Sequence, residues 1–274
     1  MFMVKTYFNL EDPIVGDSLD AISLMDLVSP VVGGLAVQIH AHELRKALRN
    51  TPDVDLITHE NMDFSQFDVG VYKNIRPVLL KLGYHVQPKK GRNNNAVKVI
   101  KNPNKPAAQN FLLNYTFFSS NLYPKFVDYI GRQIEFAKKV NYSSSRKEIL
   151  VASLEEVIPL KLQRATRYGT EREALVGPVY HALIENAKRS NWGSLAGMPL
   201  HEWSVAIDKM QKDVGTEQGP FALEKVETYK LSKDIYDICL ASRVISDDIT
   251  TFDKDRYELN IHRIFDRSTG SVAA

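Results

Sequence analysis

The chain has 274 residues, which is long enough for one large or two modest domains with a buried core. Its hydrophobic content of 44% and charged content of 25% are typical of soluble globular proteins. The single cysteine, Cys239, excludes an internal disulfide framework and a cysteine-based zinc site. No apolar run approaches the ~20 residues that span a bilayer, and the first residues lack a signal-peptide pattern. We therefore expect a cytoplasmic protein without membrane contact.

The net charge of +2 conceals a strong asymmetry along the chain. Residues 69–127 contain no Asp or Glu and ten Lys or Arg, whereas the rest of the chain holds 25 basic and 33 acidic residues. The ten cations are Lys73, Arg76, Lys81, Lys89, Lys90, Arg92, Lys98, Lys101, Lys105 and Lys125. Such a segment favours a surface that meets polyanions, although a solvated basic face without a function is the simpler alternative.

In chain order, the first half alternates helical and strand patterns. The expected helices are 17–28, 35–49 and 63–82, and the expected strands are 29–32, 54–57, 84–87, 96–101 and 110–119. Pro52 ends the second helix because a proline disfavours helix at the residue before it, and Gly83 ends the third. A turn is expected over 88–95. This order predicts a mixed α/β domain.

After about residue 120 the strand patterns become rare. We expect a helix over 124–140 and a short strand over 148–152. Ser153 and Glu156 form a capping box, which opens a helix that runs to about Arg167. Further helices are expected at 171–190, 199–214, 220–245 and 253–267. The predicted organisation is an α/β domain over 1–152 and a helical bundle over 153–274.

The stretch 31–56 contains the residues best suited to chemistry. It reads as a strand end, the glycine pair Gly33-Gly34, an amphipathic helix, and a second strand that carries Asp53 and Asp55. Residues i and i+2 of a strand point to the same face. The glycines let the backbone come close to a phosphate, and the helix start favours the anion. The pattern predicts a site for a divalent metal and the phosphates that it carries.

The order of these residues resembles the first motif of the nucleotidyltransferase superfamily, with Gly33-Gly34-Leu-Ala36 followed by Arg49-Asn-Thr51-Pro-Asp53-Val-Asp55. Within it, the resemblance is to the AbiEii-like toxin family, whose members carry Gly-Gly-x-Ala and Arg-x-Thr-x-Asp-x-Asp in this order. Lys161, on the helix opened by Ser153, resembles the lysine that the family places after a strand and a serine cap. Lys233-Asp234-Ile-Tyr-Asp237 resembles the family's Arg/Lys-Asp-x-x-Asp helix.

The resemblance implies a nucleotidyltransferase-like mixed sheet with flanking helices, followed by a helical bundle. Asp53 and Asp55 would be catalytic and bind Mg²⁺, and Lys161 would neutralise phosphate charge. Asp234 would be an acid near the reacting hydroxyl or would position Lys161. The residues implied in holding the nucleoside triphosphate are Gly33, Gly34, Arg49 and Thr51. Without the resemblance, Lys161 reads equally well as a solvated helix lysine, and Asp234 as part of a surface ion pair.

The implied activity is transfer of a nucleoside monophosphate from a nucleoside triphosphate to an acceptor hydroxyl. The resemblance further implies the toxin of a toxin–antitoxin pair, with a cognate antitoxin as partner and tRNA or another RNA as acceptor. The basic segment 69–127 agrees with an RNA acceptor, because phosphate neutralisation supplies much of RNA affinity.

Two departures from the family pattern keep other functions open. No carboxylate lies between Asp68 and Asp128, so the strand 110–119 cannot supply the third acid of many superfamily members, and Asn114 would stand in its place. Lys161 and Asp234 are 73 positions apart, which suggests a helical insertion over 168–230. The alternatives are a nucleotidyltransferase that modifies a small molecule such as an antibiotic, and a catalytically inactive nucleotide- or RNA-binding module.

Overall fold

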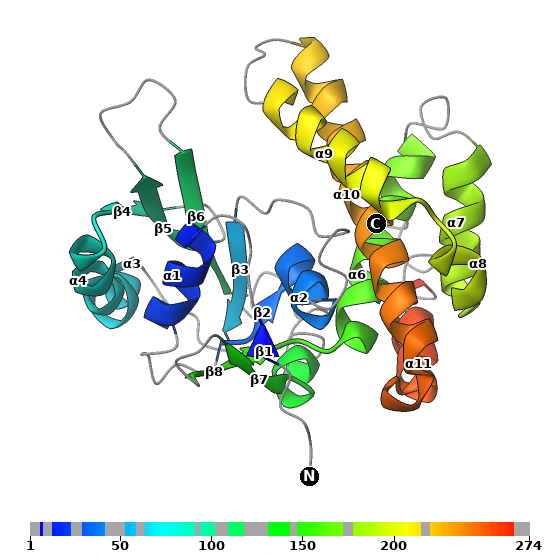
Figure 1. Ribbon diagram of the computed structural model, residues 1–274, viewed down its shortest axis with the longest axis horizontal. Coiled ribbons are helices and arrows are strands. Elements are labelled where there is room, and N and C mark those ends of the chain that lie inside the picture. Colours follow the sequence, from blue (N-terminus) through cyan, green and yellow to red (C-terminus); the bar gives the residue numbers. More distant parts are fainter. Residues whose placement is uncertain are drawn as a thin grey trace, which may run out of the picture. The chain divides into compact units, whose positions relative to one another are not determined.

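The computed structural model divides the chain into two compact units (Figure 1). The first unit comprises Met1–Ile39 and Asn50–Ser153, and the second comprises His40–Arg49 and Leu154–Ala274. The division at Ser153 lies beside the predicted boundary, but segment 40–49, expected in the first domain, groups with the second unit. The structure describes residues 6–7, 13–22, 29–41, 53–58, 64–90, 94–101, 109–117, 131–142, 147–171, 178–214 and 220–265.

The first unit contains a mixed sheet whose described strands have the order β1-β7-β8-β2-β3-β6-β5-β4. Their bounds are β1 Thr6–Tyr7, β2 Val31–Val32, β3 Asp53–Thr58, β4 His85–Lys90, β5 Asn94–Lys101, β6 Gln109–Phe117, β7 Lys138–Tyr142 and β8 Lys147–Val151. The pairs β1–β7, β2–β8 and β3–β6 are parallel, and the remaining neighbours are antiparallel. The predicted mixed sheet is confirmed, with β3 near its centre.

Helices pack against this sheet and bury its apolar side chains. α1 (Pro13–Ile22) contacts β6, β8 and α4 (Lys73–Lys81), and α4 contacts β4 (Figure 1). α3 (Phe64–Phe67) leads into α4 through a π-helical turn over Asp68–Tyr72, so the helix predicted over 63–82 is one continuous but irregular segment. α2 (Gly33–His40) begins directly after β2, two residues earlier than predicted.

The edge strand β4 is longer than predicted, because Pro88 lies inside it and not in a turn. A proline cannot donate to a sheet ladder, so it is tolerated on an edge strand when its nitrogen faces away from the neighbour. The Tyr72 hydroxyl donates to the Val86 carbonyl at 3.1 Å, which shows that residue 86 presents its polar backbone groups away from β5. Pro88, two residues on, has the same orientation and removes no ladder bond.

β7 corrects the helix predicted over 124–140. Residues 131–135 are helical, but Lys138–Tyr142 is a strand that pairs antiparallel with β8 and parallel with β1. Neighbouring strands therefore overrode a local pattern that suits a helix, and β1 itself was not predicted.

The second unit is helical, as predicted. Its described helices are α6 Leu154–Glu171, α7 Pro178–Lys188, α8 Trp192–Ala196, α9 Leu200–Val214, α10 Pro220–Asp247, a 3₁₀ turn at Ile249–Thr251, and α11 Lys254–Phe265. α10 contacts α6, α7, α8 and α9, and its middle, from Leu231 to Ser242, is buried on most sides. A helix surrounded in this way has no single apolar stripe. No described helix is long and apolar enough to cross a bilayer.

Aromatic rings fill the space between these helices. The ring of Trp192 makes edge contacts with those of Tyr257 and Phe252, at centroid distances of 5.0 and 5.5 Å. Trp203 lies edge-on to Tyr236 at 5.8 Å. Both tryptophans therefore pack between helices, and α8 lies in the stretch between the helices predicted at 171–190 and 199–214.

A buried ion-pair cluster joins α11 to the first turn of α6. Arg256 Nη2 lies 3.0 Å from Glu155 Oε2, and Arg256 Nε lies 3.6 Å from Glu156 Oε1. Both glutamates are buried, and the backbone N–H of Asp253 and the Asn260 side chain donate to Glu155. The helix dipole of α6 favours acids in its first turn, but burial of two carboxylates still requires a cation.

We therefore predict that Arg256→Met lowers the free energy of unfolding by about 3 kcal/mol, because the change leaves buried carboxylates without their cation. Urea denaturation followed by circular dichroism would measure the change. Lys254→Met is the matched control, since exposed Lys254 pairs with half-exposed Glu258 on the same helix, and a change below about 0.5 kcal/mol is expected. Equal effects of the two substitutions would contradict a structural role for the cluster.

Candidate functional site

Gly33 turns the chain from β2 into α2 and lies against a carboxylate. Its φ angle is +70°, in the left-handed region that residues other than glycine rarely adopt. A Cβ atom at this position would lie 2.8 Å from Asp55 Oδ2, closer than non-bonded atoms approach. Two independent constraints thus require glycine here: the positive φ angle, and the close approach of the α2 start to Asp55.

Asp53 and Asp55 lie on the same face of β3, as predicted. The intervening Val54 and the following Leu56 are fully buried on the opposite face, whereas both aspartates are half-buried. Antiparallel pairing with β2 sets Asp55 beside Val32, the residue before Gly33. Backbone pairing, and not sequence proximity, therefore brings the glycine turn to the two carboxylates.

The parallel pairing of β3 with β6 places position 114 beside Asp55. This is the strand on which a third acid was sought, and the residue there is Asn114. Within the described ranges, no group of three or more His, Cys, Asp or Glu side chains could hold a metal ion. A cation at this site would thus take two carboxylates from the chain and its other ligands from water and substrate, which suits Mg²⁺.

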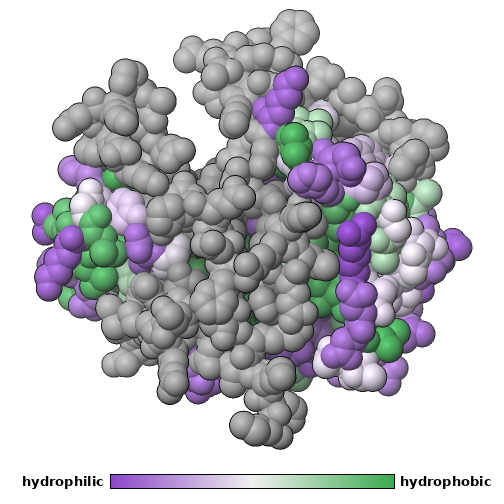
Figure 2. Space-filling model, viewed as in Figure 1, coloured by the Kyte–Doolittle hydropathy of each residue, from purple (hydrophilic) through white to green (hydrophobic). Residues whose placement is uncertain are grey.

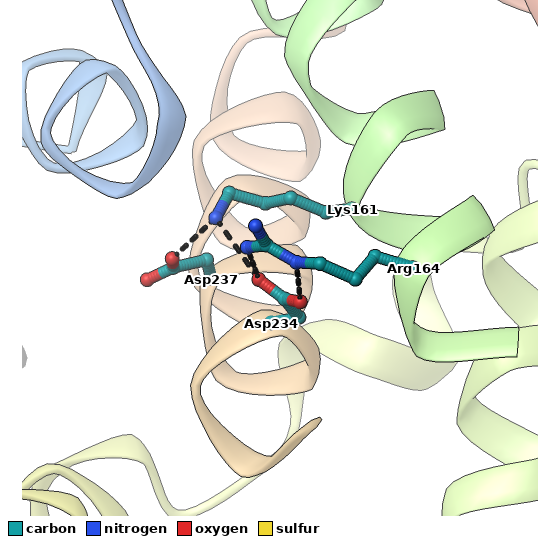
Figure 3. Close-up of polar contacts among 4 residues, drawn as sticks. All are labelled: Lys161, Arg164, Asp234 and Asp237. Carbon is teal, nitrogen blue, oxygen red and sulfur yellow. Dashed lines mark hydrogen bonds and ion pairs between the residues drawn. The ribbon is translucent and has the colours of Figure 1, made fainter. Parts of the chain in front are cut away.

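Lys161 and Asp234 come together on α6 and α10, within a network of four charges (Figure 3). Lys161 Nζ lies 2.7 Å from Asp237 Oδ2 and 3.4 Å from Asp234 Oδ1. Arg164 Nε donates to Asp234 Oδ2 at 2.5 Å, and Arg164 Nη2 donates to Asp234 Oδ1. The two cations and two carboxylates alternate, so each buried charge has at least one opposite neighbour.

The burial of this network excludes two readings that the sequence allowed. Lys161 is 3% exposed and Asp234 is 0% exposed, so the lysine is not a solvated helix residue and the aspartate is not part of a surface ion pair. Arg164 is the group that reaches solvent, with 49% of its side chain exposed. Both oxygens of Asp234 already accept hydrogen bonds from Arg164, an arrangement typical of a carboxylate that positions cations.

Sequence reasoning gave no role to Arg164 or Asp237, although their spacing carried a signal. Lys161 and Arg164 are i,i+3 on α6, and Asp234 and Asp237 are i,i+3 on α10, so each pair occupies one helix face. Two cations facing two acids on another helix form such a network only if the helices meet at these turns. Helix pairing is not encoded in the spacing alone.

The other predicted site residues differ in how they lie. Gly34 is half-buried in the first turn of α2, whereas Arg49 and Thr51 lie outside the described residues. The structure thus brings together Asp53, Asp55 and Gly33 in the first unit, and Lys161 and Asp234 in the second.

Burial raises the pKa of the Cys239 thiol to about 12 despite the opposing effect of Arg243, so this thiol stays protonated and unreactive.

Comparisons with known proteins identify no family for this chain. No protein-family model matches the sequence, and no curated protein matches it. The structure is similar to that of an antigenic nucleotidyltransferase-like protein from Paracoccidioides brasiliensis, with 18% sequence identity. The match covers 59% of this chain and 67% of the other, with a TM-score of 0.33. The likeness is too loose to support a function, which must be argued from the residues themselves.

A substitution at Gly33 should displace Asp55, whereas one at Gly83 should not. Gly83 also has a positive φ, +85°, but a Cβ there would meet nothing within 4 Å. We expect Gly33→Ala and Gly83→Ala each to lower the free energy of unfolding by about 1–2 kcal/mol through backbone strain. Gly33→Ala alone should weaken the Mg²⁺–nucleotide binding that the sequence predicts, by about tenfold or more in calorimetric titration. Undiminished binding would show that the close approach to Asp55 is not required.

The network on α6 and α10 should stabilise the helical unit. Lys161→Met removes the cation nearest to buried Asp237 and should lower the free energy of unfolding by about 3 kcal/mol. Arg164→Met affects a half-exposed side chain, and solvent screening should limit its effect to about 1 kcal/mol. Urea denaturation of both variants would test this order. An increase in stability for Lys161→Met would contradict it and would indicate charges retained for function at the expense of stability.

Proposed function

We propose that this protein is a Mg²⁺-dependent nucleotidyltransferase that moves a nucleoside monophosphate from a nucleoside triphosphate to an acceptor hydroxyl. The observation that carries the proposal is the packing of Gly33 against Asp55, because it joins a phosphate-type turn to a same-face pair of carboxylates. Either feature alone is common. Their direct contact, in a mixed sheet followed by helices, is the arrangement that such a reaction needs.

The residues of the first unit suit the metal and the triphosphate. Asp53 and Asp55 would hold Mg²⁺, which supplies charge neutralisation for the phosphates and the leaving pyrophosphate when it is bound. Because Gly33 has no Cβ, the start of α2 lies directly against the Asp55 carboxylate, and a helix start favours an anion. Gly34 continues this turn, and the predicted roles of Arg49 and Thr51 in holding the triphosphate are part of the proposal.

The absence of an acid at position 114 is compatible with this chemistry. Phosphoryl transfer depends mostly on positioning and electrostatic stabilisation, and little on covalent help from the protein. The acceptor hydroxyl oxygen attacks the α-phosphorus and its proton passes to solvent, while the bond between the α-phosphorus and the oxygen that bridges to the β-phosphate breaks and pyrophosphate leaves. Of the two predicted roles for Asp234, positioning is favoured, because both carboxylate oxygens accept hydrogen bonds from Arg164 and the side chain is fully buried.

The acceptor that we propose is RNA. The exposed cations Lys89 and Lys90 on β4 support RNA such as tRNA over a cationic antibiotic. A role as the toxin of a toxin–antitoxin pair rests on the AbiEii-like resemblance of the motifs. An inactive RNA- or nucleotide-binding module is the second candidate, and it is favoured by the neutral residue at position 114.

Label transfer from nucleotide to RNA would test the proposed activity. With Mg²⁺, total tRNA and each labelled nucleoside triphosphate in turn, the wild type should transfer label from at least one. Asp55→Asn keeps the side-chain shape but removes a metal ligand, and should lower the rate by about a hundredfold or more. Asp68→Asn is the matched control, because Asp68 pairs with exposed Lys73 away from β3 and should retain activity.

Two outcomes would overturn this assignment. Failure of the wild type to transfer label from every nucleotide to any RNA or small-molecule acceptor would leave the inactive binding module. Transfer that persists undiminished in Asp55→Asn would show that the chemistry takes place elsewhere.

A further inference from the structure

The face of the sheet that carries Asp53 and Asp55 continues across three further strands. Through the pairing of β3, β6, β5 and β4, Asp53 is in register with Lys98 and then Gln87. Asp55 is in register with Ala96 and then Lys89 by the same route. Side chains in register on neighbouring strands share a face of the sheet. The two aspartates therefore lie on the same face as Lys98, Gln87 and Lys89.

On β4 and β5 this face carries polar side chains, whereas the other side of the same strands is apolar. His85, Gln87 and Lys89 alternate along β4 and are exposed, and Lys98 is half-buried on β5. The residues between them, Val86 on β4 and Val97 and Val99 on β5, are buried in the core with Val54 and Leu56. We name the four polar residues His85, Gln87, Lys89 and Lys98 the β4–β5 platform.

The platform offers a set of donors suited to phosphate and base edges. Two lysines supply positive charge, and Gln87 Nε2 lies 2.9 Å from His85 Nε2, so these side chains are ordered by each other. No acid occurs anywhere between residues 69 and 127 to repel an anion. Strands are about 4.8 Å apart, so the three steps from β3 to β4 span roughly 14 Å. This length corresponds to about four nucleotides at the 3.4 Å rise of a stacked strand.

We propose that the β4–β5 platform binds the phosphate backbone of the last nucleotides of a single-stranded RNA acceptor, whose terminal hydroxyl lies at Asp53 and Asp55. The inference rests on the proposed nucleotidyltransferase function. It adds where the acceptor RNA binds and which end of the RNA lies at the aspartates. Acids hold the metal at one end of the sheet face, and cations hold the polyanion toward the β4 edge. A cationic small molecule would be repelled by Lys89 and Lys98.

The test compares two double variants that remove the same charge from different surfaces. Lys89→Met with Lys98→Met removes both platform lysines. Lys73→Met with Lys81→Met is the matched control, because both lysines are exposed on α4, over which hydrophilic and hydrophobic residues lie side by side (Figure 2). Steady-state transfer to a short single-stranded RNA gives KM for RNA and for nucleotide, and fluorescence anisotropy gives RNA affinity against salt.

The platform variant should raise KM for RNA by about threefold to tenfold and leave KM for the nucleotide within twofold. Its affinity should also depend less on salt, with the slope of log affinity against log salt smaller by about 1.4 for two lost phosphate contacts. The α4 control should change KM for RNA by less than twofold, because it lowers the positive electrostatic potential of the surface without removing a contact to the RNA. Circular dichroism would confirm that both variants are folded.

Equal losses in both double variants would overturn the platform, since they would indicate nonspecific attraction. A rise in KM for the nucleotide instead of RNA would also overturn it. Wild-type transfer to RNA with an unaffected platform variant would refute the platform and leave the nucleotidyltransferase function intact. Conversely, a wild type that binds RNA through Lys89 and Lys98 but transfers no label would refute that function and support the platform as an RNA-binding surface.

Discussion

The contact between Gly33 and the Asp55 carboxylate constrains the centre of the first unit. It fixes the end of β2, the start of α2 and the position of one aspartate at the same time. Any side chain at residue 33 would both strain the backbone and push Asp55 away. The pairing of β2 with β3 supplies the close approach, so the phosphate-type turn and the carboxylate pair form a single feature. The remaining strands extend this arrangement outward and place a polar face beside it.

In the second unit, buried charges join helices that the apolar core alone would leave free to slide. Arg256 with Glu155 and Glu156 joins α11 to α6, and the Lys161–Asp237 pair joins α6 to α10. A buried charge without a partner costs far more than the pair contributes, so these contacts select one register of the helices. A Lys161 variant can therefore lose activity because the helical unit is destabilised. Arg164 lies at the end of this network. About half of its side chain is exposed to solvent, and its guanidinium is bound by Asp234.

The distribution of charge along the first unit follows from this arrangement. Residues 69–127 include α4, β4, β5 and β6, so β6 beside β3 carries no acid, and β5 and β4 beyond it carry cations and no acids. The same absence of acids removes the third carboxylate from β6 and makes the sheet face toward β4 favourable for a polyanion. One compositional bias thus accounts both for the missing acid at position 114 and for the cationic surface on which the proposed RNA acceptor depends.

The sequence by itself determined the elements whose signals are local. The alternation of Asp53, Val54, Asp55 and Leu56, the helix start directly after Ser153 and the glycine turn each depend on spacing within a few residues, and the structure has them as expected. Only the tertiary structure decided which elements meet. The contact of Gly33 with Asp55, the inclusion of Arg164 and Asp237 in the charge network, and strand β7 all require partners distant in sequence. Local geometry fixes spacing within a helix or strand, whereas strand register and helix packing follow from burying the whole set of apolar and paired polar groups at once.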